Sequence, residues 1–195
     1  MSTQPKPYIT PEQYLEIERA AEYKSEYFDG EMFAMSGVRL NHATIVTNLV
    51  ASIRAQLRGK NCRIAASDLR LQVRRRGPYF YPDIVVFCGK PKLADNWHDM
   101  LTDATVIIEV LSPSTEKYDR TFKFEHYAQL ASLTDYIVVA QERMHVEQKT
   151  RQADESWAMG ETSDADAVIG IASIGCSFRV GDAYEQVEFE PPREA

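Results

Sequence analysis

The sequence predicts an α/β protein (α+β, with a mixed β-sheet). Residues 81–87 and 105–111 are apolar runs rich in β-branched residues and bounded by Gly, Pro or Asp, which is typical of buried strands. A helical segment over 119–132 precedes another apolar run at 135–140. A helix between two strands is the connection that parallel neighbours use, so the last two strands are expected to run parallel.

The N-terminal part adds two helices and a hairpin. Thr10 and Gln13 form a capping box ahead of an amphipathic segment, which predicts a short helix. An Asp-Gly pair between aromatic residues predicts a hairpin over 27–33. Asn41 is a suitable N-cap for a helix over 42–58. The apolar stripe of this second helix is Ile45, Leu49, Ile53 and Leu57.

Apolar and polar residues alternate over 64–74, which predicts a strand with one polar face. A turn at 74–78 would pair this strand with the 81–87 strand as an antiparallel hairpin. The expected core order is therefore helix–strand–strand–strand–helix–strand. Weaker strand signals follow at 144–149, 168–174 and 184–189. We expect a single domain over 1–195, with a core over 8–142 and a C-terminal extension of strands over 143–195 that could form a dimer interface.

The bulk properties exclude some classes of protein. The net charge of −7 argues against a protein that coats nucleic acid through bulk charge, although a local basic face remains compatible with it. The chain has no apolar run long enough for a transmembrane helix and no apolar leader, so no membrane association is expected. Cys62, Cys88 and Cys176 are widely spaced, which is typical of reduced thiols and predicts a cytoplasmic protein.

Two carboxylates stand inside the apolar runs, and they are the first candidate functional residues. A buried unpaired charge costs on the order of several kcal/mol, so Asp83 and Glu109 must reach water, be paired or bind a cation. Asp83 could simply cap a turn, and Glu109 could pair with Lys123 or an arginine. Two acids on two apolar strands favour a site for a hard metal ion such as Mg²⁺, on which they can converge if the strands are neighbours.

Other polar residues have both structural and functional interpretations. Lys123 follows Asp119 by one helical turn, which suits a solvated salt bridge, but its ammonium could also stabilise a scissile phosphate. Asp68 is either a second metal ligand or a surface residue. His42 could serve a functional site or only a structural role at the start of its helix. Glu31 could likewise be functional or simply a solvated strand residue. Four arginines could contact a phosphate backbone, or could simply be solvated residues of the strand and the hairpin tip. They are Arg70, Arg74, Arg75 and Arg76.

The chain resembles the PD-(D/E)XK nuclease superfamily and, within it, the Uma-type family of restriction-endonuclease-like proteins. The resemblance covers most of residues 8–142. Its most specific part is the Glu-Val-Leu-Ser-Pro-Ser-Thr segment that begins at Glu109, followed by Asp119, Lys123 and Tyr127. The other segments that carry it are 27–31, Asn41-His42, 81–84 and 135–139.

The resemblance implies a restriction-endonuclease-like core and a Mg²⁺-dependent DNA endonuclease, with Mn²⁺ able to substitute. Asp83, Glu109 and the Val110 carbonyl would ligate the metal, and Lys123 would complete the catalytic set. The superfamily lysine falls two residues after the glutamate, where this chain has Leu111, and the family relocates it to the following helix. The auxiliary positions implied are Glu31, His42, Asp68 and Tyr127.

Three functions are therefore compared. The leading hypothesis is a metal-dependent endonuclease that binds DNA as a homodimer. A catalytically idle nuclease-fold module for nucleic-acid or protein binding is the second, favoured by the acidic charge and Leu111. A metal-dependent hydrolase of small phosphodiesters also fits the acidic charge, and salt dependence separates it from a DNA-binding enzyme.

Overall fold

The computed structural model describes residues 7–189, and its centre is a six-stranded mixed sheet in the order β11-β10-β9-β8-β6-β3. The strands are β3 (Cys62–Ala66), β6 (Ile84–Cys88), β8 (Val106–Leu111), β9 (Asp135–Ala140), β10 (Val146–Arg151) and β11 (Trp157–Thr162). Only β8 and β9 run parallel among these neighbours. Every residue of β8 and β9 is buried, as their apolar sequences predict for central strands.

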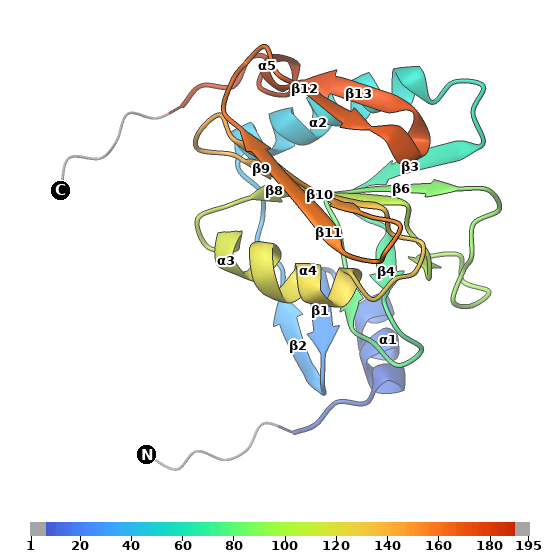
Figure 1. The fold of residues 1–195 in the computed structure, drawn as a ribbon. Coiled ribbons are helices and arrows are strands. Elements are labelled where there is room, and N and C mark those ends of the chain that lie inside the picture. The colour runs from blue at the N-terminus through green and yellow to red at the C-terminus, as the bar shows by residue number, and fades with distance from the viewer. Residues whose placement is uncertain (1–6, 190–195) are drawn as a thin grey trace.

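Two layers cover the sheet, one on each face (Figure 1). One layer comprises α2 (Leu40–Gln56), β12 (Val168–Ile171), the 3-10 turn η2 (Ala172–Ile174), β13 (Cys176–Arg179) and α5 (Val180–Ala183). The predicted stripe of α2 faces the sheet, and none of Ile45, Leu49, Ile53 and Leu57 is more than 2% exposed. The opposite layer contains the helical segment α3 (Glu116–Tyr118), η1 (Asp119–Lys123) and α4 (Phe124–Tyr127).

A second sheet, in the order β2-β1-β5-β4-β7, lies below that helical segment in Figure 1. Its strands are β1 (Ser25–Phe28), β2 (Glu31–Ala34), β4 (Arg70–Gln72), β5 (Tyr79–Phe80) and β7 (Met100–Leu101). The helix α1 (Pro11–Ala20) begins with the predicted capping box, and the predicted Asp-Gly turn joins β1 to β2. The helix–strand order of the core and the antiparallel pairing of β3 with β6 agree with the sequence prediction.

The predicted strand over 64–74 is wrong in one respect, because it is two strands in two sheets. β3 ends at Ala66 and β4 starts at Arg70, and Ser67 between them adopts a left-handed backbone with φ of 62°. The Ser67 N–H donates to the Asp83 carbonyl, which turns the chain from the large sheet toward the small one. Asp68 is therefore an exposed linker residue, whereas Arg70 is buried.

Several element ends also differ from prediction. Asn41 lies inside α2 and its side chain donates to the Glu188 carbonyl, so it is not the N-cap. The helix expected over 119–132 starts at Glu116 and ends at Tyr127. Residues 184–189 form no strand; instead, the Tyr184 hydroxyl contacts the loop between β9 and β10. β11 was not predicted, because its mostly exposed residues show no alternation. Residues 190–195 of the C-terminal extension lie outside the described residues.

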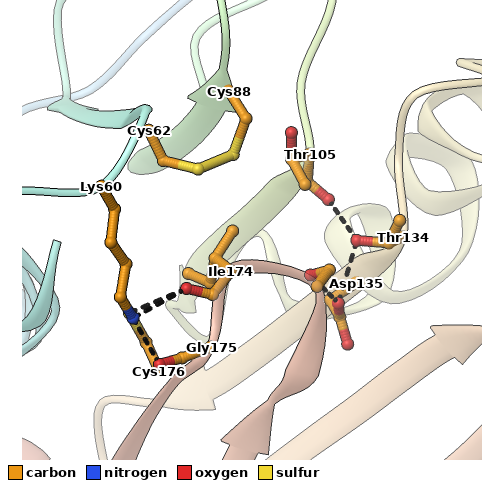
Figure 2. The surroundings of a disulfide bond; sticks show 10 residues. Lys60, Cys62, Cys88, Thr105, Thr134, Asp135, Ile174, Gly175 and Cys176 are labelled. Carbon is orange, nitrogen blue, oxygen red and sulfur yellow. Dashed lines mark hydrogen bonds between the residues drawn. A yellow bond between two sulfur atoms is a disulfide. The ribbon is translucent and has the colours of Figure 1, made fainter.

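The expectation of three reduced thiols is wrong, because two of the three cysteines form a disulfide. Cys62 and Cys88 lie directly opposite each other in the β3–β6 pair and form a disulfide, while Cys176 is free and buried. Figure 2 shows this bridge and, at the end of the Lys60 side chain away from it, the ammonium that points to the carbonyls of Ile174 and Gly175. Sequence spacing could not show this pairing, because only the sheet register makes the two residues neighbours.

We expect reduction of this disulfide to lower the free energy of unfolding by about 3.5 kcal/mol, the entropy effect of opening a loop of this length. The two cysteines are 26 residues apart in the chain. Urea unfolding with and without dithiothreitol measures the change. A Cys62→Ser/Cys88→Ser double variant is the control and should not respond to dithiothreitol. Equal stability of the oxidised and reduced wild type would contradict the expectation.

Within residues 7–189, none of the helices is both long and apolar enough to cross a membrane.

Candidate functional site

A cavity of about 550 Å³ opens where the two sheets meet the helical segment. Four carboxylates and one ammonium line it, and they come from four parts of the chain. They are Glu26 on β1, Asp83 just before β6, Glu109 on β8, and Asp119 and Lys123 on η1. Glu26, Glu109, Asp119 and Lys123 are each at most 7% exposed.

Asp83 and Glu109 lie side by side because β6 and β8 are paired neighbours. The Asp83 N–H donates to Glu109 Oε2 at 3.2 Å, and the Val110 N–H donates to Asp83 Oδ2 at 2.7 Å. His42, in the first turn of α2, places its Nε2 3.1 Å from the same Asp83 oxygen. Backbone and imidazole contacts thus fix the orientation of both acids.

Lys123 is surrounded by three of the carboxylates. Its Nζ lies 3.0 Å from Glu26 Oε1, 3.2 Å from Glu109 Oε1 and 3.2 Å from Asp119 Oδ1. The contact with Asp119 lacks hydrogen-bond geometry, so Asp119 Oδ1 is a buried oxygen without a hydrogen bond. The solvated Asp119–Lys123 pair considered from the sequence is therefore a buried one.

The local helix geometry explains why this pair turns inward. η1 is a single π-helical turn between α3 and α4, and Asp119 and Lys123 are its first and last residues. Such π turns occur frequently at functional sites. The Tyr136 hydroxyl donates to the Asp119 carbonyl at 2.9 Å, which anchors the start of this turn to β9.

Two tyrosines complete the hydrogen bonding of the acids. Tyr127, one turn after Lys123, donates to Glu109 Oε1 at 3.0 Å. Tyr118 donates to Glu26 Oε2 at 3.2 Å, and the Tyr81 N–H donates to Glu26 Oε1 at 3.3 Å. Tyr127 was predicted as an auxiliary residue, and the structure places it against Glu109.

Burial and charge set the protonation of the cavity. Burial raises the pKa of Glu109 well above 4.5 despite the nearby Lys123, and Asp83 and Asp119 raise it further. Burial also raises the pKa of Asp119. Burial disfavours the charged form of Lys123, but Glu109 and Glu26 outweigh it and raise the pKa of Lys123. In the cavity Lys123 therefore stays charged, while burial and mutual repulsion disfavour ionisation of Glu109 and Asp119 together.

The donor set fits a hard divalent cation. Carboxylate oxygens are the ligands that Mg²⁺ prefers, and four carboxylates line this cavity. Its cationic side chains are the buried Lys123 and the exposed Arg39, which pairs with Glu142. Asp119 Oδ1 has no partner with hydrogen-bond geometry, and its counter-charge is the Lys123 ammonium at 3.2 Å. Val110 also lines the cavity, as expected for a residue whose carbonyl would join the ligands.

The remaining predicted residues lie elsewhere. Glu31 and Asp68 are exposed and do not line the cavity, and the Asp68 carboxylate contacts Lys24. Arg70 is only 3% exposed and donates to Asp99, so its proposed contact with a phosphate backbone is corrected. The arginines of the hairpin tip, Arg74, Arg75 and Arg76, are exposed and do not line the cavity.

The sequence reasoning missed Glu26 and underrated Asp119. Glu26 stands in an aromatic strand whose first three residues are buried. The criterion applied to Asp83 and Glu109, a lone acid inside an apolar strand, could have found it. Leu111, at the superfamily's lysine position, is 3% exposed and packs in the core with Tyr127 and Tyr136, while Lys123 supplies an ammonium from the helix.

We expect the metal-free protein to lose stability as the pH rises above about 4.5. The pKa of Glu109 is raised in the folded state, so the unfolded chain releases its proton first, and increasing pH then favours unfolding. Asp119 acts in the same direction. Groups with lowered pKa, such as Asp99, act below this interval.

Thermal unfolding in the presence of a chelator, at about pH 5 and about pH 8, measures this dependence. Excess Mg²⁺ should restore stability at the higher pH, because a ligand that binds only the folded state stabilises it. A metal-free protein that becomes more stable between these two values would contradict the expected sign.

The fold and the cavity together define an α/β protein in which carboxylates and a lysine converge where the central strands of the mixed sheet, the second sheet and the helical segment meet. The Uma2 family model, described as "Putative restriction endonuclease", matches residues 11–180. The chain belongs to this family, which confirms the resemblance seen in the sequence.

The chain is also similar to two other proteins and to one solved structure. Two proteins of Synechocystis, each described as uncharacterized, are 35% identical over 185 residues and 32% identical over 161 residues. The first match covers 95% of this chain and 96% of the relative, and the second covers 83% and 91%. A crystal structure described as "a putative nuclease belonging to DUF820" from Anabaena variabilis matches this chain with a TM-score of 0.75 at 18% identity. The match covers 92% of this chain and 99% of the Anabaena chain, so the two proteins share a fold.

Proposed function

We propose that the protein is a metal-dependent DNA endonuclease that hydrolyses phosphodiester bonds. The observation that supports this most is the convergence of Asp83, Glu109 and Lys123 on one cavity. Membership of the Uma2 family is the second support. Mg²⁺, with Mn²⁺ able to substitute, would supply Lewis-acid polarisation of the phosphate and a lowered pKa of the attacking water.

The chain's own residues divide the remaining tasks. Asp83, Glu109 and the Val110 carbonyl would hold the ion, and His42 and Tyr127 keep the two carboxylates oriented. Lys123 stays positive and would stabilise the negative charge that develops on the phosphate. Glu26 and Asp119 position the Lys123 ammonium, since both contact its Nζ.

We propose a homodimeric assembly and a cytoplasmic location for the enzyme. Cleavage of both DNA strands is helped by two sites, so a homodimer is proposed, with the C-terminal strands as its interface. A cytoplasmic location is proposed with it, and the Cys62–Cys88 pair would then be exposed to cellular thiols.

The second candidate, an idle nuclease-fold module that binds nucleic acid or protein, is favoured by one observation. The Lys123 ammonium is already fully surrounded by carboxylates, so the cavity carries its own cation. Such a module would bind its partner equally well with and without divalent metal.

Cleavage of supercoiled plasmid in Mg²⁺ or Mn²⁺ tests the proposal. The wild type should nick the plasmid, and Asp83→Ala should not. The control variant Asp154→Asn should behave as wild type, because it changes only an exposed carboxylate in the turn between β10 and β11. No cleavage of plasmid or single-stranded DNA by the wild type would favour the idle module. Equal cleavage by all three proteins would indicate a contaminating nuclease. Hydrolysis of a small aryl phosphodiester that is insensitive to salt, without plasmid nicking, would favour the small-substrate hydrolase.

A further inference from the structure

We propose a second metal site, which is separate from the cavity and binds Zn²⁺. It lies at the open end of the β10–β11 hairpin, where β10 begins and β11 ends. Its ligands are the imidazole of His145 and the carboxylates of Glu147 and Glu161. One ligand atom from each lies within 4.8 Å of the other two. None of the three lines the cavity that holds Asp83 and Glu109.

The backbone brings these side chains together. Glu147 on β10 and Glu161 on β11 are directly paired across the antiparallel ladder, and His145 precedes Glu147 by two residues. The Tyr184 hydroxyl accepts the His145 N–H at 3.0 Å and lies 2.8 Å from the Ala140 carbonyl. The loop that carries His145 is therefore fastened to α5 and its flanking turn rather than held only by its own hairpin.

The imidazole is oriented as a ligand requires. His145 Nε2 points to both carboxylates, 3.0 Å from Glu147 Oε1 and 3.7 Å from Glu161 Oε2. His145 Nδ1 lies 3.0 Å from Ser163 Oγ. In the metal-free protein the Nε2–H donates to Glu147 Oε1 at 3.0 Å. With a metal bound, Nδ1 would carry the proton and donate to Ser163 Oγ, which would free the Nε2 lone pair for the ion, and metal-ligating histidines commonly hold their second nitrogen in this way.

The local charges also favour a bound cation. Like charges directly opposite each other in a sheet are destabilising, and the Glu147–Glu161 pair has this arrangement. Arg120 contacts Glu147, but it also pairs with Glu116 at 2.9 Å, so it is shared between two acids. Glu161 is 71% exposed, and its ion-pair partner is His145.

The ligand chemistry selects the type of ion. One imidazole nitrogen and two carboxylate oxygens suit Zn²⁺, which accepts both, whereas Mg²⁺ prefers oxygen ligands alone. With three protein ligands, the fourth position of a tetrahedral ion would be open to water. A protonated His145 that bridges the two acids without metal is the competing arrangement, and the experiment distinguishes the two.

Zn²⁺ titration by calorimetry tests the site in the full chain carrying Asp83→Asn, which weakens the cavity as a metal site. This protein should bind one equivalent of Zn²⁺. Adding His145→Ala or Glu161→Gln should weaken binding by at least about tenfold, and Ser163→Ala by about tenfold, as expected for a residue that orients a ligand. Asp154→Asn, in the turn of the same hairpin, is the matched control and should leave binding unchanged.

Metal-free melting curves show whether each variant folds, and Glu161→Gln changes only an exposed side chain. Co²⁺ should give a visible absorption spectrum that His145→Ala removes. Absence of Zn²⁺ binding in the Asp83→Asn protein, or binding that His145→Ala and Glu161→Gln leave unchanged, would overturn the proposal. Both results are independent of nuclease activity, so failure of the proposed function would leave this test intact.

Discussion

Replacing Glu109 by Gln is expected to reduce metal-dependent plasmid cleavage by at least about 100-fold. Mutating a residue that only holds a metal ligand in place already costs up to about 100-fold in activity, and Glu109 is itself a proposed ligand. The same change is expected to stabilise the metal-free protein at about pH 8. Glu109 is buried among Asp83, Asp119 and Glu26, and these acids and its burial outweigh Lys123 and disfavour its charged form. A neutral amide keeps the contacts to Tyr127 and Lys123 and removes that repulsion.

Opposite changes in activity and stability make this variant informative, because a merely misfolded protein would lose both. Chemical unfolding and plasmid cleavage measured on the same preparation give the two values. Glu125→Gln, an exposed position on the same helical segment, is the control and should change neither. Loss of stability together with loss of cleavage in Glu109→Gln would indicate that the carboxylate is needed for the fold, and would remove the electrostatic explanation.

Lys123→Met is expected to abolish cleavage and to tighten metal binding by at least about tenfold. The ammonium and a divalent ion would compete for the same carboxylates and repel each other at close range, so removing the ammonium favours the ion. Lys123 contacts Glu26, Glu109 and Asp119. The metal-free variant should be less stable by about 3–5 kcal/mol, because buried carboxylates lose their counter-charge.

Calorimetric titration with Mg²⁺ and Mn²⁺ measures the affinity, and melting curves with and without metal measure the rescue of stability. Lys149→Met is the matched control, since Lys149 is also buried but stacks on Phe124 outside the cavity. Its metal affinity should equal that of the wild type. Weaker metal binding in Lys123→Met, or cleavage that persists, would show that the lysine does not share the metal's carboxylates.

These two variants also separate the proposed functions. An endonuclease needs Lys123 for the reaction although the lysine opposes metal binding, so activity and affinity should change in opposite directions. An idle module uses Lys123 as its permanent cation, and its metal-free state should be the binding-competent one. The contacts around Lys123 are the same in both cases, and only the response to metal distinguishes them.

Much of the fold and part of the site follow from local sequence patterns. β-Branched runs predict the central strands, and the helical segment before 135–140 predicts the parallel pair of β8 and β9. A single acid inside each of two apolar runs identifies Asp83 and Glu109, because burying a carboxylate needs a specific reason. The break between β3 and β4 could not be predicted, since alternation continues through it while Ser67 turns the chain.

The sequence by itself thus determined the class of fold, the family and the three residues on which the proposed site depends. Only the tertiary structure decided which distant residues meet. Glu26 meets Lys123 because the helical segment packs against β1, whereas Cys62 meets Cys88 and Glu147 faces Glu161 because of sheet register. A shift of one residue in register would turn each side chain to the opposite face, and no local pattern in the chain specifies that pairing.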